Sequence, residues 1–171
     1  MNGTVLIRAP SSRLAEGIVT HISRVPVVVA LARAQHAAYA GALEASGWMI
    51  RSVPAAEDCP DSVFIEDAVV VCEDLAVLAR PGAPARRAEV PGVAGVLESL
   101  GLRTARIQEP GTLDGGDVLQ AGHTVYVGRG GRTNGAGIRQ LRALLAPLGR
   151  TVIAVPLENV LHLKSAVTAL P

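Results

Sequence analysis

The chain has 171 residues, of which 49% are hydrophobic and 18% charged, and its formal net charge is +1. This length allows one domain with a hydrophobic core, and the composition is that of a globular chain. A near-neutral charge and an aromatic content of 2% give neither a basic surface nor base-stacking platforms. The longest apolar run, 25–31, is far too short to cross a membrane. We therefore expect a protein that binds neither nucleic acid nor membranes.

The cysteine content indicates a reducing compartment. Cys59 and Cys72 are the only cysteines, and their spacing matches neither a metal-binding pair nor a disulfide framework. The N-terminal residues lack the basic and apolar pattern of a signal peptide. We expect reduced thiols and a cytoplasmic location.

The first third of the chain predicts two strands around one helix. Residues 4–7 form a short apolar strand pattern. Residues 11–23 have little periodicity, so we expect a mobile loop or a broken helix there. An alanine-rich helix is expected over 27–46, closed by Gly47, and a strand over 48–53 follows it.

The next stretch predicts a unit of strand, strand, helix and strand. Apolar patterns over 68–72 and 75–79 indicate a hairpin. A helix then ends at Gly101, and a strand is expected over 102–107. The helix has an apolar face formed by Val93, Val96, Leu97 and Leu100.

The same order recurs after about fifty residues. A hairpin is expected over 118–127, a helix with a leucine-rich face ends at Gly149, and a strand over 151–155 follows. Asp67 and Asp117 hold matching places at the mouths of the two hairpins. Self-similarity at this period is typical of propellers and solenoids. If the units close around an axis, their loop ends converge on one cleft.

Acidic residues mark the mouths of both hairpins. Asp114 and Asp117 flank a Gly-Gly pair, which allows a tight turn and close approach of other groups. Asp61, Glu66 and Asp67 lie one unit earlier, beside apolar strand residues. Carboxylates in such places need a partner, and a guanidinium fits two of them well. The partner is either a guanidino ligand or an internal arginine, for which Arg80, Arg86 and Arg87 are candidates.

Several arginines lie in Gly-flanked loops, where they are either solvated or able to bind a substrate carboxylate. These arginines are Arg86, Arg87, Arg129 and Arg132.

His162 is the candidate acid/base. It lies between two leucines, on an expected strand, and Asp114 at the mouth of the preceding unit is placed to orient its ring. A nucleophile is harder to find, because neither Cys59 nor Cys72 lies in a Gly-rich elbow or an electropositive pocket. A metal set would need Asp114, Asp117, His123 and His162, and no ligand spacing supports it, so we expect no metal.

Five motifs together resemble the dimethylarginine dimethylaminohydrolase family, of the guanidino-group modifying superfamily. They are CPDSVFIED at 59–67, RPG…RR at 80–87, GTLDGGD at 111–117, GRTN at 131–134 and LHLKS at 161–165. The resemblance implies an α/β fold, a five-bladed propeller (pentein) of ββαβ units. Residues 1–171 would form a single propeller domain, incomplete at its C-terminal end, with about three of the five blades.

The resemblance also implies roles for eight residues. His162 would be the general acid/base and Asp114 its orienting carboxylate. Asp61, Glu66 and Asp67 would surround the substrate guanidinium, Arg86 and Arg132 would bind the substrate carboxylate, and Ile18 would belong to a lid. The family needs neither a metal nor an organic cofactor.

The activity implied is hydrolysis of Nω-methylated arginines to citrulline and dimethylamine. The family carries its nucleophilic cysteine near the C-terminus, and no residue here corresponds to it, so we expect this chain alone to be inactive. The alternatives are an arginine deiminase or amidinotransferase, or a non-catalytic ligand-binding fragment. An incomplete propeller would expose strand edges, so association into homo-oligomers is also expected.

Overall fold

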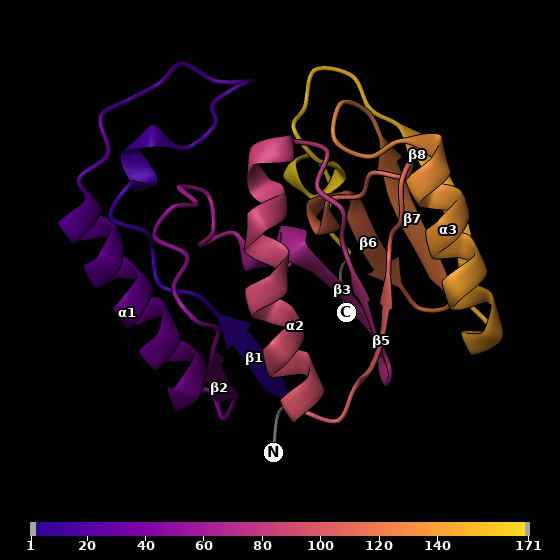
Figure 1. The fold of residues 1–171 in the computed structure, drawn as a ribbon, viewed down its shortest axis with the longest axis horizontal. Helices are drawn as coiled ribbons and strands as arrows, with labels where there is room; N and C mark the ends of the chain where they lie inside the picture. The colour runs from indigo at the N-terminus through magenta and orange to yellow at the C-terminus, as the bar shows by residue number, and fades with distance from the viewer. Residues whose placement is uncertain (1–2, 170–171) are drawn as a thin grey trace.

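The computed structural model describes residues 3–169, and it arranges them as three consecutive units, each with its own small sheet. In the first unit, strand β1 (Thr4–Ile7) pairs in parallel with strand β2 (Met49–Ser52), and helix α1 (Val29–Ala45) connects them. Figure 1 shows this unit at one side of the molecule, with helices α2 and α3 following across it. The expected loop over 11–23 is confirmed, since a 3₁₀ turn at Leu14–Glu16 is its only regular element.

The second unit has the predicted order of strand, strand, helix and strand. Strand β3 (Val69–Cys72) is antiparallel to strand β4 (Leu75–Leu78). Helix α2 (Val90–Ser99) then carries the chain to strand β5 (Arg103–Arg106), which pairs in parallel with β4.

The third unit repeats this arrangement. Strand β6 (Val118–Ala121) is antiparallel to strand β7 (Thr124–Arg129), and helix α3 (Gly135–Leu145) leads to strand β8 (Thr151–Pro156), parallel to β7. The predicted ββαβ repeat is therefore confirmed. Both units also begin with a short 3₁₀ turn before the first strand, at Ile65–Ala68 and Gly115–Asp117.

A glycine closes each helical segment, as predicted. Gly47, Gly101 and Gly149 have φ angles of 85°, 72° and 66°, in the left-handed region that glycine enters without a Cβ clash. The chain can therefore turn sharply from each helix into the strand that follows.

The hydrophobic core joins the second and third units. Its main cluster takes buried residues from β3, β4, β6, β7, β8 and α3, among them Val77, Val127, Leu141 and Leu145. A second cluster packs α2 against β4 and the end of the first unit, through residues such as Val93, Leu97 and Val53. This packing fixes the hairpin mouths of the second and third units against each other.

The expectation that His162 lies on a strand is wrong. β8 ends at Pro156, the chain turns at Asn159 with a φ of 61°, and His162 is the extended residue before a 3₁₀ turn at Leu163–Ser165. The alternating Leu-His-Leu pattern resembles a strand, but the amide of Leu163 donates to the Asp117 carboxylate instead of to a neighbouring strand. Leu170 and Pro171 lie outside the described residues.

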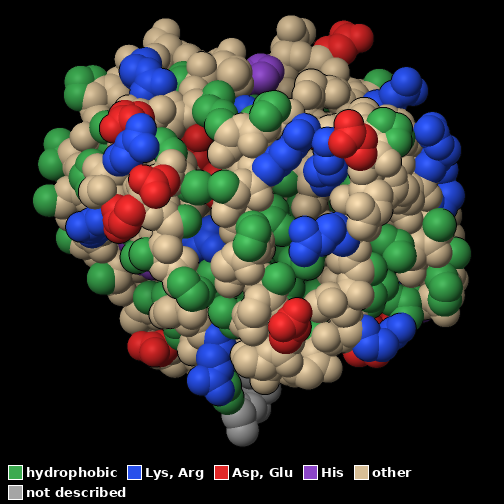
Figure 2. All heavy atoms as spheres, in the orientation of Figure 1, with side chains coloured by type: hydrophobic (Ala, Val, Ile, Leu, Met, Phe, Trp, Pro, Cys, Tyr) green, Lys and Arg blue, Asp and Glu red, His purple; other side chains and the backbone are tan. Residues whose placement is uncertain are grey.

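The surface agrees with the near-neutral charge. On the face drawn in Figure 2, acidic and basic side chains are interspersed among apolar ones. Within residues 3–169, no helix has both the length and the apolar character needed to cross a bilayer.

Candidate active site

The predicted site residues gather around one pocket of about 1160 Å³. Of the eight, all except Asp114 line it, and Asp114 is fully buried behind His162. The pocket takes residues from all three units, because the 3₁₀ turns before β3 and β6 contact each other and the loop after β8 packs onto the second turn. The sequence prediction that the unit mouths converge is therefore confirmed for this part of the chain.

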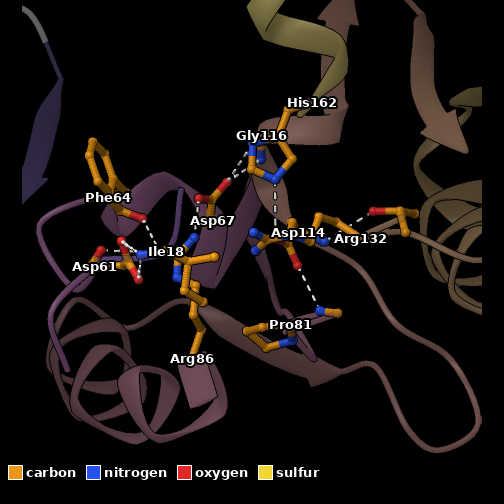
Figure 3. Close-up of polar contacts among 12 residues, drawn as sticks. Ile18, Asp61, Phe64, Asp67, Pro81, Arg86, Asp114, Gly116, Arg132 and His162 are labelled. Atoms are coloured by element: carbon orange, nitrogen blue, oxygen red, sulfur yellow. Dashed lines mark hydrogen bonds and ion pairs between the residues drawn. The ribbon is translucent and has the colours of Figure 1, made fainter. Parts of the chain in front are cut away.

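His162 and Asp114 form a buried pair. The Nε2 atom of His162 lies 3.1 Å from Oδ2 of Asp114 (Figure 3). The other carboxylate oxygen of Asp114 accepts a hydrogen bond of 2.9 Å from the amide of Gly82, and Arg132 Nη1 lies 3.6 Å from Oδ2. These contacts fix the Asp114 carboxylate, which in turn orients the imidazole.

A second carboxylate faces the other side of the imidazole ring. Asp67 Oδ1 lies 3.8 Å from Nδ1 of His162 and accepts a hydrogen bond of 2.8 Å from the amide of Gly116. A Cβ atom at Gly116 would lie 2.6 Å from both Asp67 Oδ1 and His162 Nδ1, so only glycine fits between them. The Gly-Gly pair therefore lets His162 approach the second unit.

This setting favours a protonated His162. Burial by itself would lower the pKa of His162, but the hydrogen bond to Asp114 and the charges of Asp67, Asp117 and Asp114 outweigh it and raise the pKa above its ordinary value. A raised pKa increases the share of imidazolium at any given pH, and the imidazolium can donate its proton to a leaving group.

Arg86 pairs internally with the acids of the second unit. Its Nη1 donates to Asp67 Oδ2 at 2.6 Å, and its Nε and Nη2 donate to Glu89 at 3.0 and 2.8 Å. Two further bonds go to the carbonyls of Asp61 and Phe64, so Arg86 is almost fully satisfied. The sequence left open whether the acids pair with a guanidino ligand or with an internal arginine, and Asp67 is paired with the internal Arg86. Whether Arg86 also binds a substrate carboxylate stays a prediction.

The loop at 11–23 is tied to the pocket through Asp61. Both carboxylate oxygens of Asp61 lie 3.1 Å from the amide of Ile18, and the Ile18 side chain lines the pocket. A Cβ at Gly17 would lie 2.6 Å from Asp61 Oδ1, so this approach also depends on glycine. Figure 3 shows Ile18 beside the Asp61 carboxylate, and the lid role of this loop stays a prediction.

The remaining predicted residues lie toward the rim of the pocket. Glu66 is exposed and pairs with Lys164 at 2.6 Å. Arg132 is half-buried, and its Nη1 contact of 3.6 Å to Asp114 is longer than a hydrogen bond. Arg132 is thus less fully engaged by the protein than Arg86.

Three buried residues near the centre were not assigned to the site from the sequence. Glu89 holds Arg86, and Thr133 and Asp117 hold the His162–Asp114 pair. The i, i+3 spacing of Arg86 and Glu89 could have suggested their ion pair. Nothing in the spacing of Thr133 indicates its contacts.

Among the described residues, the side chains with potential metal-ligating atoms close together are Asp67, Asp114 and His162, whose atoms lie within 4.8 Å of one another. This differs from the set considered from the sequence, which included His123. The ion pairs and hydrogen bonds above already account for the group.

Neither cysteine reaches the pocket. Cys72 is buried in β3 and Cys59 in the loop that precedes the second unit, and neither lines the pocket wall. Burial, together with the Glu89 charge, also raises the pKa of the Cys59 thiol, which disfavours the thiolate.

Comparisons with known proteins identify the fold and the family. No protein-family model matches the sequence. The structure is similar to that of a cysteine-to-serine variant of Pseudomonas aeruginosa DDAH complexed with citrulline, with a TM-score of 0.91 and 36% identity over 96% of this chain and 65% of that one. An N-terminal domain of ArgZ, an arginine dihydrolase from cyanobacteria, has the same fold at 19% identity and a TM-score of 0.79. The fold is that of a pentein of the guanidino-group modifying class.

Sequence comparison identifies the family within this class. The chain is 60% identical over 166 residues to an N(G),N(G)-dimethylarginine dimethylaminohydrolase of Streptomyces coelicolor, covering 97% of this chain and 64% of the relative. It is 36% identical to the enzyme of the same name from Pseudomonas aeruginosa, covering 65% of that protein. The chain belongs to the dimethylarginine dimethylaminohydrolase family, and it spans about two thirds of the length of these relatives.

Proposed function

We propose that this chain supplies the guanidinium-binding and acid/base part of an enzyme that hydrolyses Nω-methylated arginine to citrulline and dimethylamine. The observation that carries the proposal is the buried His162, held between Asp114 and Asp67 at the wall of the pocket. The names of the two relatives above support the choice of substrate.

The nucleophile in this proposal is a cysteine thiolate from polypeptide outside these 171 residues, because Cys59 and Cys72 do not line the pocket. The thiolate attacks the guanidinium carbon and forms a C–S bond. As the C–N bond breaks, His162 donates its proton to the departing dimethylamine, which leaves as a neutral amine. A covalent thiouronium-type intermediate remains.

His162, now neutral, completes the second half of the reaction. It takes a proton from a water molecule whose oxygen attacks the same carbon. The C–S bond breaks, the thiolate is regenerated, the second proton of that water is released to solvent, and citrulline leaves. Asp114 keeps the ring in one orientation and stabilises its charged form throughout.

The acids and arginines would bind the rest of the substrate. In this proposal Asp67, with Asp61 and Glu66 nearby, attracts the guanidinium. Arg132 is the first candidate for the substrate carboxylate, because its donors are less engaged than those of Arg86. The loop of Ile18 closes over the bound substrate and excludes water.

We also propose that residues 1–171 belong to one propeller domain, since the second and third units share a core. A cytoplasmic location, where both thiols stay reduced, and association of copies through open strand edges remain proposals.

The test uses a chimera in which this chain is joined to the third of the Streptomyces coelicolor relative that it does not match. We expect the chimera to form citrulline and dimethylamine from dimethylarginine, and the chimera with His162→Asn and the 171-residue chain alone to form neither. A folded chimera without turnover, while the relative is active, would contradict the proposal. Turnover by the chain alone would contradict the external nucleophile. Preference for unmethylated arginine would favour a deiminase.

A further inference from the structure

A buried carboxylate lies directly beneath the His162–Asp114 pair. Asp117, the last residue of the 3₁₀ turn before β6, is 1% exposed. Its Oδ2 accepts a hydrogen bond of 2.6 Å from the hydroxyl of Thr133, and its Oδ1 accepts one of 3.1 Å from the amide of Leu163, the residue after His162. Asp117 thus holds the segment that carries the histidine.

The same pair of residues also holds the acid. The amide of Asp114 donates a hydrogen bond of 3.1 Å to the Thr133 hydroxyl, while this hydroxyl donates to Asp117. With the 3.1 Å contact between His162 and Asp114, the bonds form a closed ring that runs through Asp114, Thr133, Asp117 and the backbone beside His162. All four residues are buried.

The position of Thr133 is itself fixed by the start of helix α3. The side chain of Asn134 caps this helix by accepting from the amide of Gly137 at 2.8 Å, and it also accepts from the amide of Thr112 at 3.1 Å. A Cβ at Gly137 would lie 2.0 Å from the Thr112 carbonyl oxygen, so the start of α3 packs directly on the loop between β5 and the 3₁₀ turn at Gly115–Asp117. Thr133 is therefore held beside Asp114 by the fold.

The Asp117 carboxylate also packs directly against strand β7. A Cβ at Gly128 of β7 would lie 2.6 Å from Asp117 Oδ1, so the carboxylate fills the space beneath the strand. A buried carboxylate with both oxygens hydrogen-bonded to groups from two other segments behaves as a fixed joint between them.

We propose that Asp117 and Thr133 are positioning residues, which set the distance and orientation between His162 and Asp114. This inference rests on the proposed acid/base function of His162, but its geometry is a property of the 171-residue chain. Neither residue lines the pocket, so neither would touch the substrate. Their effect would act entirely through the imidazole.

The test compares Thr133→Val, which removes the hydroxyl at nearly constant volume, with Thr133→Ser, which keeps it. The readout is the pKa of His162 by NMR titration in the 171-residue chain, with His21, His36 and His123 as internal references. We expect Thr133→Val to lower the pKa of His162 by about 0.5–1 unit, because a loosened Asp114 stabilises the imidazolium less. Thr133→Ser should restore the parental value.

Other charges near the imidazole must stay constant in this comparison. These are Asp67 and Asp117, together with Arg86 and Arg132, which contact Asp67 and Asp114. Thr133→Ser alters none of them, whereas Thr133→Val also removes the hydrogen bond that lowers the pKa of Asp117. Comparing Thr133→Val/Asp117→Asn with Asp117→Asn alone holds this charge constant. Asp117→Asn is a second arm that keeps the shape and removes one charge, and we expect it also to lower the pKa of His162.

A merely structural role would give a different result. In that case Thr133→Val would lower the denaturant midpoint but leave the pKa of His162 unchanged, and this result would overturn the inference. The inference would also be overturned if Thr133→Ser and Thr133→Val gave the same pKa of His162. Should Thr133→Val not fold, Thr133→Ala, which removes the same hydroxyl and no charge, decides by the same readout. In the chimera, we expect Thr133→Val to lower kcat about tenfold with little change in KM. A chimera without any turnover would count against the proposed function and leave the titration result standing.

Discussion

Replacing Arg86 by methionine should destabilise the chain more than any other single arginine substitution that we consider. Arg86 is 4% exposed, and its guanidinium makes five hydrogen bonds, three of them to the carboxylates of Asp67 and Glu89. Methionine keeps much of the volume but removes the charge and every donor. Two buried carboxylates would then lose the guanidinium that they share.

The magnitude follows from this geometry. Removing one partner of a buried ion pair typically costs about 3–5 kcal/mol, and here two carboxylates lose the same partner, so we expect a loss of about 4–5 kcal/mol. This is a large part of the roughly 5–15 kcal/mol by which domains are stable. The free energy of unfolding is measured by denaturant titration, followed by circular dichroism.

The matched control is Arg103→Met. Arg103 also forms a two-bond pair with a carboxylate, Asp74, but the two side chains are 61% and 59% exposed. Exposed pairs contribute little, so this variant should unfold close to the parental midpoint. Equal midpoints for Arg86→Met and the parental chain would refute the reasoning.

The loss in Arg86→Met should also depend on pH. Burial raises the pKa of Glu89, and the hydrogen bond and charge of Arg86 offset part of this rise. Without Arg86 the folded-state pKa lies further above the unfolded value. A group with a raised pKa adds stability at low pH, and this contribution is lost as the pH rises through the folded-state pKa. The deficit should therefore be larger near pH 8 than near pH 5.

Two further predictions concern the glycine and acid contacts of the pocket. Gly116→Ala should lower the free energy of unfolding by about 1–3 kcal/mol and disturb the titration of His162, because the new methyl group would lie 2.6 Å from the ring. The control is Gly131→Ala, which has open space around it, and its free energy of unfolding should stay within about 0.5 kcal/mol of the parental value. Asp61→Ala should speed hydrogen exchange of the Ile18 amide on the order of fivefold, the worth of one hydrogen bond; unchanged exchange would mean that Asp61 does not hold the loop.

The repeat was predictable because it rests on local signals. Gly47, Gly101 and Gly149 mark the helix ends, and short stretches with apolar or alternating residues indicate the strands. The period then placed Asp114 and His162 at converging loop ends, and the structure brings them to 3.1 Å. The family motifs named the same two residues.

The interior of the site was less predictable, because its contacts depend on how the units dock. Arg86 could have been directed at a ligand or at the protein, and only the packing of the 3₁₀ turn beside it decides in favour of Asp67 and Glu89. In the sequence alone, nothing distinguishes Thr133 from other residues that precede a helix. The sequence placed His162 on a strand because of the alternating Leu-His-Leu pattern. This pattern does not show which group accepts the hydrogen bond of the next amide, and here the acceptor is Asp117.

The interlocking of successive units has a consequence for the order of folding. Each hairpin and each helix forms from residues close in sequence, whereas the contacts of His162 with Asp114, of Gly116 with Asp67 and of Leu163 with Asp117 span 48, 49 and 46 residues. Contacts of long sequence separation form only after the entropy of loop closure has been overcome. The imidazole should therefore acquire its native environment late, when the units dock, which makes His162 an internal probe of docking as distinct from the formation of the units themselves.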